Sequence, residues 1–279
     1  MAENTINELL EFYSNLKCDG KNTKDIEASK DVEDSFDSVE QIGRIAYDSE
    51  DIQRHRYINI GTILKNAIQH FLPQKNVGAN VYVDPDWMAR FLDCAKDVSD
   101  DEMRLIWSRV LSGELNKPNS ISVMTLETLR NMSKHDAEIF HKLASFTVID
   151  DDGGDPFIPN NGFWSDGQFK SDKDYGINYD ELLWMQELRL VNLNAGLVMR
   201  FDKDDKDARI ETILKCGNLS IKMTSDLMVQ ISCYGYTRIG AQLLSLIEDI
   251  SPNEGFFEDR IKNRYSSEST KIEINTSDI

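Results

Sequence analysis

Closely spaced helix signals between Asp84 and Phe146 constrain the fold of this chain most. Asp84 followed by Pro85 predicts a helix start, because the carboxylate can accept a backbone N–H and proline tolerates the first helical position. Ser99 and Glu102 have the spacing of a capping box. Apolar residues follow at three- and four-residue steps, as an amphipathic helix requires: Met103, Ile106, Trp107, Val110 and Leu111.

Further helices are predicted on both sides of these two. Apolar residues at helical steps run from Asp48 to Pro73, and Ser133 with Asp136 starts another helix after the turn at Pro118. Short connections between amphipathic helices predict an antiparallel helical bundle. The aromatic residues of the block are spaced for core packing rather than for a binding pocket: Trp87, Phe91 and Trp107.

The second half of the chain has a different pattern. Gly, Asp, Asn and Pro crowd residues 148–174, which predicts a loop at the domain junction. Asn178 and Glu181 then indicate a capped helix over 179–189, and TRIGAQLL returns to a helical pattern after Tyr236. The segments between these helices are rich in β-forming residues: 196–201, 208–216, 219–224 and 228–236. This order indicates a winged-helix-like module.

The predicted fold is therefore mainly α with a C-terminal α+β module: an N-terminal antiparallel helical bundle followed by a winged-helix-like domain. A length of 279 residues fits two domains. The expected division is a short helix and acidic linker at 1–47, the helical bundle domain at 48–147, a loop at 148–174, the winged-helix-like α+β domain at 175–266 and a polar tail at 267–279. We expect the tail to be loose unless it pairs with a partner or a sheet edge.

Charge bears on the choice of partner. The chain has 31 Lys and Arg against 49 Asp and Glu, so its net charge is −18. A surface that neutralises many phosphates is hard to build from this balance, which disfavours nucleic acid. The helix and hairpin that would have to contact DNA in a winged-helix module are themselves acid-rich. We therefore expect protein partners, with self-association as one form of them.

Cysteine usage and hydropathy predict a cytoplasmic protein. The four cysteines are scattered without a CxxC pair: Cys18, Cys94, Cys216 and Cys233. The chain opens without a basic leader or an apolar signal segment. No apolar run approaches the roughly 20 residues that span a bilayer. Phosphate-binding loops of the G-x-x-x-x-G-K-[ST] and G-x-G-x-x-G types are missing from the sequence. We expect no cofactor.

One pattern points to nuclease chemistry. Arg130 and His135 have the R-x4-H spacing of a group of all-helical ribonucleases, in which the two side chains would stabilise charge and transfer a proton at a phosphodiester. The motif straddles the helix start at Ser133, and two fixed positions arise often by chance. A structural role is the favoured interpretation.

A cluster of carboxylates raises the question of a metal. Asp150, Asp152 and Asp155 can supply oxygen ligands to calcium or magnesium, because hard cations prefer carboxylates. The EF-hand spacing fails, since Gly154 occupies the fifth position counted from Asp150. Solvated turn residues are the favoured interpretation, and we expect no metal site.

The block over 84–143 resembles bacterial families known as domains of unknown function. The elements that carry the resemblance are DxDWxxRF, SDxEMxxxWxxxLxGE, TLxxL after a proline-serine turn, and S-x-x-D-A-x-x-F. They are largely capping and core residues, so the resemblance implies a shared scaffold and no assigned active site. Accessory families of this kind occur in bacterial defence settings, which implies antiviral defence as a setting.

The leading functional hypothesis is a non-enzymatic cytoplasmic sensor, adaptor or scaffold that acts through protein contacts. A strong fold pattern without a catalytic pattern, the acidic composition and the resemblance favour it. A metal-independent ribonuclease using Arg130 and His135 is the first alternative. A winged-helix DNA-binding regulator is the second.

Overall fold

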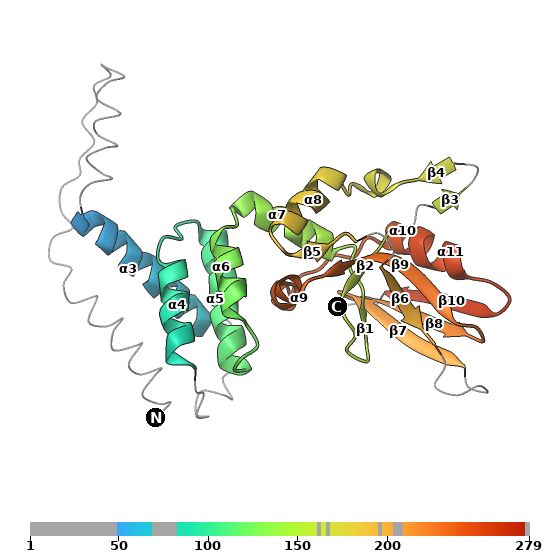
Figure 1. The fold of residues 1–279 in the computed structure, drawn as a ribbon, viewed down its shortest axis with the longest axis horizontal. Helices are drawn as coiled ribbons and strands as arrows, with labels where there is room; N and C mark the ends of the chain where they lie inside the picture. Colours follow the sequence, from blue (N-terminus) through green and yellow to red (C-terminus); the bar gives the residue numbers. More distant parts are fainter. Residues whose placement is uncertain are drawn as a thin grey trace, which may run out of the picture. The chain divides into compact units, whose positions relative to one another are not determined.

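The computed structural model describes residues 49–68, 83–160, 163–165, 168–194, 197–202 and 209–276. The chain forms two compact units, residues 1–126 and 127–279, which divide within one helix, α6 (Figure 1). The short helix and acidic linker predicted at 1–47 lie outside the described residues. The predicted domain boundaries at 148–174 and beyond stay a prediction.

Helices make up the described part of the first unit. They are α3 (Ser49–Asn66), α4 (Pro85–Ala95), α5 (Asp101–Asn116) and the start of α6 (Val123–Arg130). Asp84 caps α4 as predicted, because its carboxylate accepts the backbone N–H groups of Asp86 and Trp87. The capping box predicted at Ser99 is wrong. Asp100 caps α5 by accepting from Glu102 and Met103, and so takes the position next to the first helical turn.

Aromatic side chains hold α4 and α5 together. Trp87 stacks on Phe91 with ring centroids 5.4 Å apart, and Phe91 meets Trp107 edge to face at 5.5 Å. All three are buried, which confirms that they are core residues. The indole N–H of Trp87 donates to the Ile121 carbonyl at 2.8 Å, so it also fixes the chain before α6.

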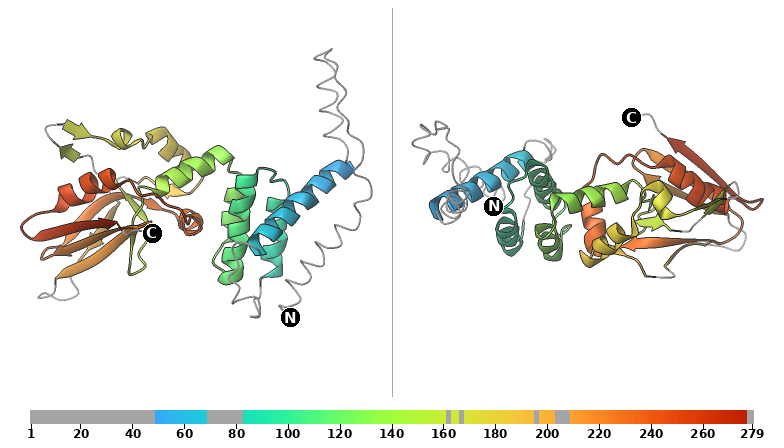
Figure 2. Two further views of the ribbon diagram at one scale, coloured as in Figure 1. Left: turned by 180° about the vertical axis from the view of Figure 1, so that it is seen from behind. Right: turned by 90° about the horizontal axis from the view of Figure 1, so that it is seen from above.

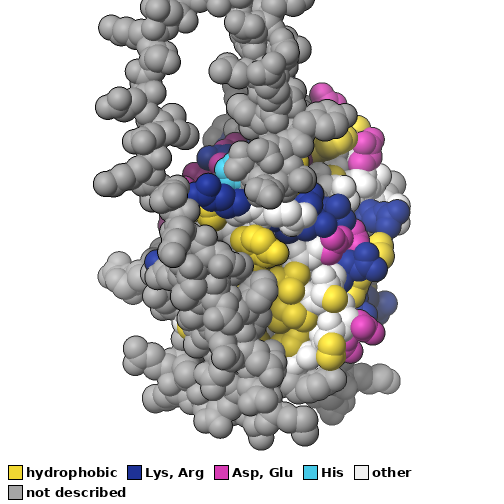
Figure 3. Space-filling model, turned by 90° about the vertical axis from the view of Figure 1, so that its left-hand side faces the viewer, with side chains coloured by type: hydrophobic (Ala, Val, Ile, Leu, Met, Phe, Trp, Pro, Cys, Tyr) yellow, Lys and Arg dark blue, Asp and Glu magenta, His cyan; other side chains and the backbone are white. Residues whose placement is uncertain are grey.

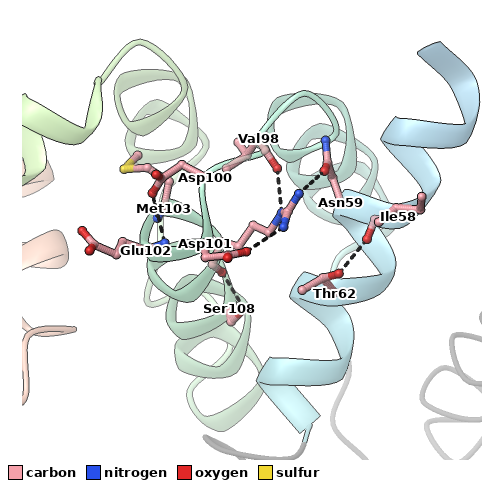
Figure 4. Close-up of polar contacts among 10 residues, drawn as sticks. Ile58, Asn59, Thr62, Val98, Asp100, Asp101, Glu102, Met103 and Ser108 are labelled. Carbon is pink, nitrogen blue, oxygen red and sulfur yellow. Dashed lines mark hydrogen bonds and ion pairs between the residues drawn. The ribbon is translucent and has the colours of Figure 1, made fainter. Parts of the chain in front are cut away.

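Arg104 links α3 to α5 by polar contacts (Figure 4). Its Nη2 donates to Asn59 Oδ1 at 2.7 Å, its Nε to the Val98 carbonyl at 3.1 Å and its Nη1 to Asp101 at 2.8 Å. Asn59 is buried, and its amide N–H donates in turn to the Lys96 carbonyl. One guanidinium therefore satisfies groups on two helices and on the turn that precedes α5.

Hydrophobic side chains gather on the face of the molecule shown in Figure 3, with Lys and Arg side chains beside them. On α3, the large hydrophobic residues with high exposure are Tyr57 and Ile58. Ile60, Ile63 and Leu64 of the same helix are buried, so α3 carries both buried and exposed apolar side chains.

The second unit combines helices with antiparallel sheets. Its helices are α7 (Lys134–Ala144), α8 (Tyr179–Glu187), α9 (Arg238–Leu244), α10 (Glu254–Phe257) and α11 (Asn263–Tyr265), with the short turns η2 (Asp172–Tyr175) and η3 (Glu258–Lys262). Its strands are β1 (Ile149–Asp150), β2 (Phe157–Pro159), β3 (Phe163–Ser165), β4 (Gln168–Lys170), β5 (Val191–Asn192), β6 (Val198–Phe201), β7 (Ile210–Cys216), β8 (Leu219–Ser225), β9 (Val229–Tyr236) and β10 (Thr270–Thr276). The predicted helix starts at Ser133 and Asn178 are confirmed.

Two larger sheets organise these strands (Figures 1 and 2). One has the order β1-β7-β8-β10, and the other has β2-β9-β5 with β6 also paired to β9. Burial alternates along β7 and β8, so one face of the first sheet is buried. The turn between them needs Gly217, which has φ 53° and whose added Cβ would lie 2.2 Å from the Ile250 carbonyl oxygen.

The predicted fold class is wrong. A mainly α chain with a helical bundle and a winged-helix-like domain does not describe a unit built on two antiparallel sheets. The β-rich segments at 210–236 were found individually, but their partners come from distant segments. β1 pairs with β7, β2 with β9 and β10 with β8. The segment expected to be a polar tail contributes β10, which pairs with β8 at the edge of the sheet.

Buried Glu114 offers a test of the first unit. It is 2% exposed, and its carboxylate accepts the backbone N–H groups of Asn119 at 2.6 Å and Ile121 at 2.9 Å. Glu114→Gln would turn an N–H₂ group toward one of these donors, so we expect a loss of about 1–3 kcal/mol in the free energy of unfolding. Urea denaturation followed by circular dichroism measures it. Glu102→Gln, at an exposed position of the same helix, should cost no more than about 0.5 kcal/mol.

Candidate functional site

Helix α8 exposes two large aromatic side chains. Tyr179 is 59% exposed and Trp184 is 46% exposed, whereas Leu182 and Met185 of the same helix are buried. Single exposed apolar residues are common on protein surfaces, but a Trp and a Tyr on one short helix are the side chains most enriched at binding hot spots. We call Tyr179 and Trp184 the α8 surface.

Polar contacts from α7 hold α8 in place. The indole Nε1 of Trp184 donates to Asp136 Oδ1 at 2.6 Å, and Lys142 Nζ lies 2.7 Å from Glu181 Oε2. Asn178 caps α8 by accepting the backbone N–H of Asp180. The exposed indole ring is therefore fixed in orientation by a hydrogen bond at its N–H.

Asp136 serves two elements at once. Its Oδ2 accepts the backbone N–H of Ser133 at 2.7 Å and the Ser133 hydroxyl at 2.8 Å, while Oδ1 accepts from Trp184. Burial acts to raise the pKa of Asp136, but these hydrogen bonds outweigh it and hold the pKa below its usual value. The carboxylate therefore stays ionised where α7 begins.

A buried arginine anchors the segment that leads into α8. The side chain of Arg260 is 0% exposed, and its Nη2 donates to Asp172 Oδ1 at 2.7 Å. The other oxygen of Asp172 accepts the Tyr234 hydroxyl at 3.0 Å. Burial raises the pKa of Asp172 above its usual value, although Arg260 and Tyr234 both oppose the shift. Burial also raises the pKa of Tyr234, with the Asp172 charge adding to the effect.

Asp259, the neighbour of Arg260, gathers a second set of donors. Lys170 Nζ and the Tyr175 hydroxyl each lie 2.5 Å from its Oδ2, and Asn263 donates to Oδ1 at 3.1 Å. Burial acts to raise the pKa of Asp259, but these hydrogen bonds and the Lys170 charge hold it below its usual value. Asp259 and Arg260 lie in η3, a π-helical turn, and such turns are frequent at functional sites.

Aromatic rings surround the Arg260 guanidinium. Its central carbon lies 5.5 Å from the Tyr175 ring centroid and 5.6 Å from that of Phe256. Among the described residues, its Nε and Nη1 have no hydrogen-bond acceptor. Cation–π attraction to the two rings partly compensates these N–H groups. We call Arg260, Asp172, Tyr234, Tyr175, Asp259 and Lys170 the Arg260 cluster.

The comparison with known families adds to this geometry. The model of a family described as a protein of unknown function, DUF2806, matches residues 43–259, well over half of the chain. The chain belongs to the DUF2806 family. This confirms the resemblance expected from the block at 84–143. Neither a curated protein nor a solved structure matches the chain.

The predicted nuclease residues lie on the surface of this DUF2806 protein. Arg130 is the last residue of α6 and His135 the second residue of α7, and both are exposed. His135 is 77% exposed at its side chain, and its Nδ1 lies 3.7 Å from Glu138 Oε2. The residue between His135 and the cap, Lys134, is exposed as well. The catalytic role of Arg130 and His135 stays a prediction.

The predicted metal ligands are spread along β1 and the turn that follows. Asp150 accepts the Thr212 hydroxyl at 3.0 Å, and Asp152 donates its backbone N–H to the Asp150 carboxylate at 3.3 Å. Asp155 is exposed on the loop before β2. In the part of the chain that the structure describes, no group of three His, Cys, Asp or Glu side chains is placed to hold a metal ion.

Sequence reasoning missed both the α8 surface and the Arg260 cluster. The first has a signal, since Leu182 and Met185 define the buried side of the predicted helix 179–189 and leave Trp184 off it. The second has none, because Asp172 and Arg260 are 88 residues apart.

None of the described helices is long and apolar enough to cross a membrane.

Removing the buried guanidinium should destabilise the second unit. Arg260→Met leaves Asp172 without its ion-pair partner, so we expect a loss of about 3–5 kcal/mol in the free energy of unfolding. The double variant with Asp172→Asn should lose less than the sum of the two single variants. Urea denaturation measures all three. Arg200→Met removes an exposed ion pair and should change the free energy by no more than about 1 kcal/mol; an equal loss there would contradict a special role for Arg260.

The lowered pKa of Asp136 predicts a pH dependence. The folded-state pKa lies below the usual 3.8, so Asp136 contributes stability above that pH, and the contribution is lost as the pH falls through the folded-state pKa. Asp136→Asn should therefore be less stable than the wild type at neutral pH, by about 1–3 kcal/mol, and the difference should shrink below about pH 4. Thermal unfolding across pH tests this. A difference that is constant with pH would show that the carboxylate charge is irrelevant.

Proposed function

We propose that this DUF2806 protein is a non-enzymatic, cytoplasmic sensor or adaptor that works through protein contacts, and that the α8 surface is where a partner binds. The observation that carries this is the exposure of Tyr179 and Trp184 on a helix that is held in place by its buried Leu182 and Met185. Both side chains present a large rigid area with few rotatable bonds, so little conformational entropy is lost when a partner covers them.

The hydrogen bond between Trp184 and Asp136 supports this assignment. A ring already held at 2.6 Å by its N–H does not need to be ordered on binding. Preorganisation of this kind increases affinity without adding contacts. Trp184 can therefore act as the anchor of the α8 surface, and Tyr179 at the start of the helix adds a second exposed ring.

Charge around the α8 surface favours a particular chemistry of the partner. Asp180, Glu187 and Asp174 are exposed near it, and hydrogen bonds from Ser171 hold the pKa of Asp174 below its usual value. With a net charge of −18 over the chain, the local field is expected to be acidic. The partner we propose has an apolar pocket or groove rimmed by Lys and Arg.

A cytoplasmic location is part of the proposal. Cys216 and Cys233 are buried thiols, and burial raises their pKa values to about 12 and about 11. Such thiols are inert core residues that suit a reducing compartment. A setting in antiviral defence stays a prediction that rests on the family resemblance.

Partner capture with matched variants tests the proposal. The tagged full chain is expressed in its host and isolated, and its partners are quantified by mass spectrometry. Tyr179→Ala removes one exposed ring, and Trp184→Gln removes the other while keeping an N–H donor. We expect each to lower recovery of the partner by at least about tenfold, because hot-spot residues are worth about 2 kcal/mol or more. Leu227→Gln, at an exposed hydrophobic residue of the β8–β9 turn, should leave recovery unchanged.

Two results would overturn the proposal. One is recovery of the same proteins in the same amounts with all three variants. The other is cleavage of mixed RNA by the purified chain that His135→Ala abolishes, which would favour the ribonuclease alternative.

A further inference from the structure

β10 forms an edge of the four-stranded sheet. The strand order is β1-β7-β8-β10, and within the part of the chain that the structure describes no strand lies beyond β10 (Figures 1 and 2). The strand is 7 residues long and pairs with β8 along its whole length. An edge strand presents a row of backbone N–H and C=O groups that can pair with another strand.

The register shows which groups face outward. β7 and β8 are joined by a turn of two residues between Cys216 and Leu219, so Leu219 and every second residue after it bond to β7. The alternate residues of β8, Ser220, Lys222 and Thr224, therefore bond to β10. The hydrogen bond from the Asp226 N–H to the Ser269 carbonyl, one step further in the same alternation, agrees with this. Among the residues that the structure describes, the outward-facing backbone groups of β10 at Ile272, Ile274 and Thr276 therefore have no strand to pair with.

Side chains alternate along the same strand. Ile272 is buried, whereas Lys271 and Glu273 on either side of it are exposed on the other face. In the pairing of β10 with β8, Glu273 lies directly opposite Lys222. The exposed face at this edge therefore carries a Lys and a Glu two residues apart, with a second Lys one strand inward.

We propose that β10 pairs with β10 of a second copy of this chain, antiparallel and centred on Ile272. This arrangement is self-complementary under a two-fold axis. It places Lys271 opposite Glu273 of the second copy, and Glu273 opposite Lys271, while the two Ile272 residues exchange their outward hydrogen bonds. The two sheets become one continuous sheet. Across the junction the charges alternate from Lys222 to Glu273 of one copy and then to Lys271 of the second copy.

Charge selects this register from its neighbours. Centring the pairing on Glu273 would place the two Glu273 carboxylates directly opposite each other, which is destabilising. Centring it on Ile274 would place Glu273 opposite Asn275 and leave no opposite-charge pair among the described residues. Opposite charges across a strand pair each contribute a few tenths of a kcal/mol to about 1 kcal/mol, and the register centred on Ile272 has two such pairs.

One end of β10 has to adjust. The Thr270 N–H donates to the Ser267 carbonyl at 3.3 Å, a long bond, and the Thr270 carbonyl accepts from Ser267 at 2.9 Å. Both bonds use the outward-facing groups of Thr270, so Ser267 lies where Ile274 of the other copy would pair with Thr270. The dimer therefore requires the Ser267 turn to release Thr270.

Charge-swap variants of the full chain test the pairing. Sedimentation over about a hundredfold range of concentration should show a monomer–dimer equilibrium. Lys271→Glu and Glu273→Lys each convert two opposite-charge pairs into like-charge pairs, so each should weaken dimerisation by about tenfold or more. The double variant restores both pairs in exchanged form and should return to within about threefold of the wild type. Glu211→Lys makes the same charge change on the same face two strands inward and should leave the equilibrium unchanged.

Amide hydrogen exchange gives a second readout that does not depend on the variants folding. In the wild type, exchange at Ile272 and Ile274 should slow as the concentration rises, while other strand amides keep their rates. A monomer at every concentration would overturn the proposal. So would a dimer that both single swaps leave intact, or that the double swap fails to restore. Because the α8 surface takes no part in this pairing, failure here leaves the proposed partner site untouched, and loss of partner capture leaves the dimer untouched.

Discussion

The ion pair between Arg260 and Asp172 is the interaction on which the second unit depends most. A guanidinium with no exposure would be very costly without compensation, and the Asp172 carboxylate and two aromatic rings provide it. Such a pair is weak evidence for net stability, since a well-packed apolar group often does as well. Its effect is on specificity, because only one arrangement of η2 against η3 satisfies it.

This constraint extends to the surface. Hydrogen bonds and ion pairs to Asp259 and Arg260 hold the segment from Lys170 to Tyr175. Asn178, the N-cap of α8, follows only three residues later. On the other side, Asp136 and Lys142 of α7 hold Trp184 and Glu181. A helix of 9 residues would have little stability by itself. Here it is fixed at its start and along its side, which is what a preorganised binding surface requires.

How much of this could be predicted depended on distance along the chain. Caps at Asp84, Ser133 and Asn178 were found because a cap is decided within three residues. The error of one residue at Asp100 has the same origin, since Ser99 and Asp100 both satisfy the local pattern and only backbone geometry separates them. Strands such as β7 and β8 were found from composition, but strand partners, and with them the fold class, were not.

The α8 surface was within reach of the sequence, and the Arg260 cluster was not. A helical projection of 179–189 separates Trp184 from Leu182 and Met185. Arg260 in contrast reads as one basic residue in a polar helix, and nothing near it indicates that its partner lies in a Gly- and Asp-rich loop. Long-range ion pairs leave no periodic trace.

The separation of Asp172 and Arg260 also has a consequence in time. A ribosome adds about 5–20 residues per second, so the 88 residues between Asp172 and Arg260 take roughly 4–18 s to synthesise. During this interval Asp172 has no Arg260 to pair with, and Tyr175 and Tyr234 are added before the guanidinium exists. The helices of the first unit precede this interval, and their contacts close over shorter loops. The Arg260 cluster of the second unit can therefore be completed only after η3 has been synthesised.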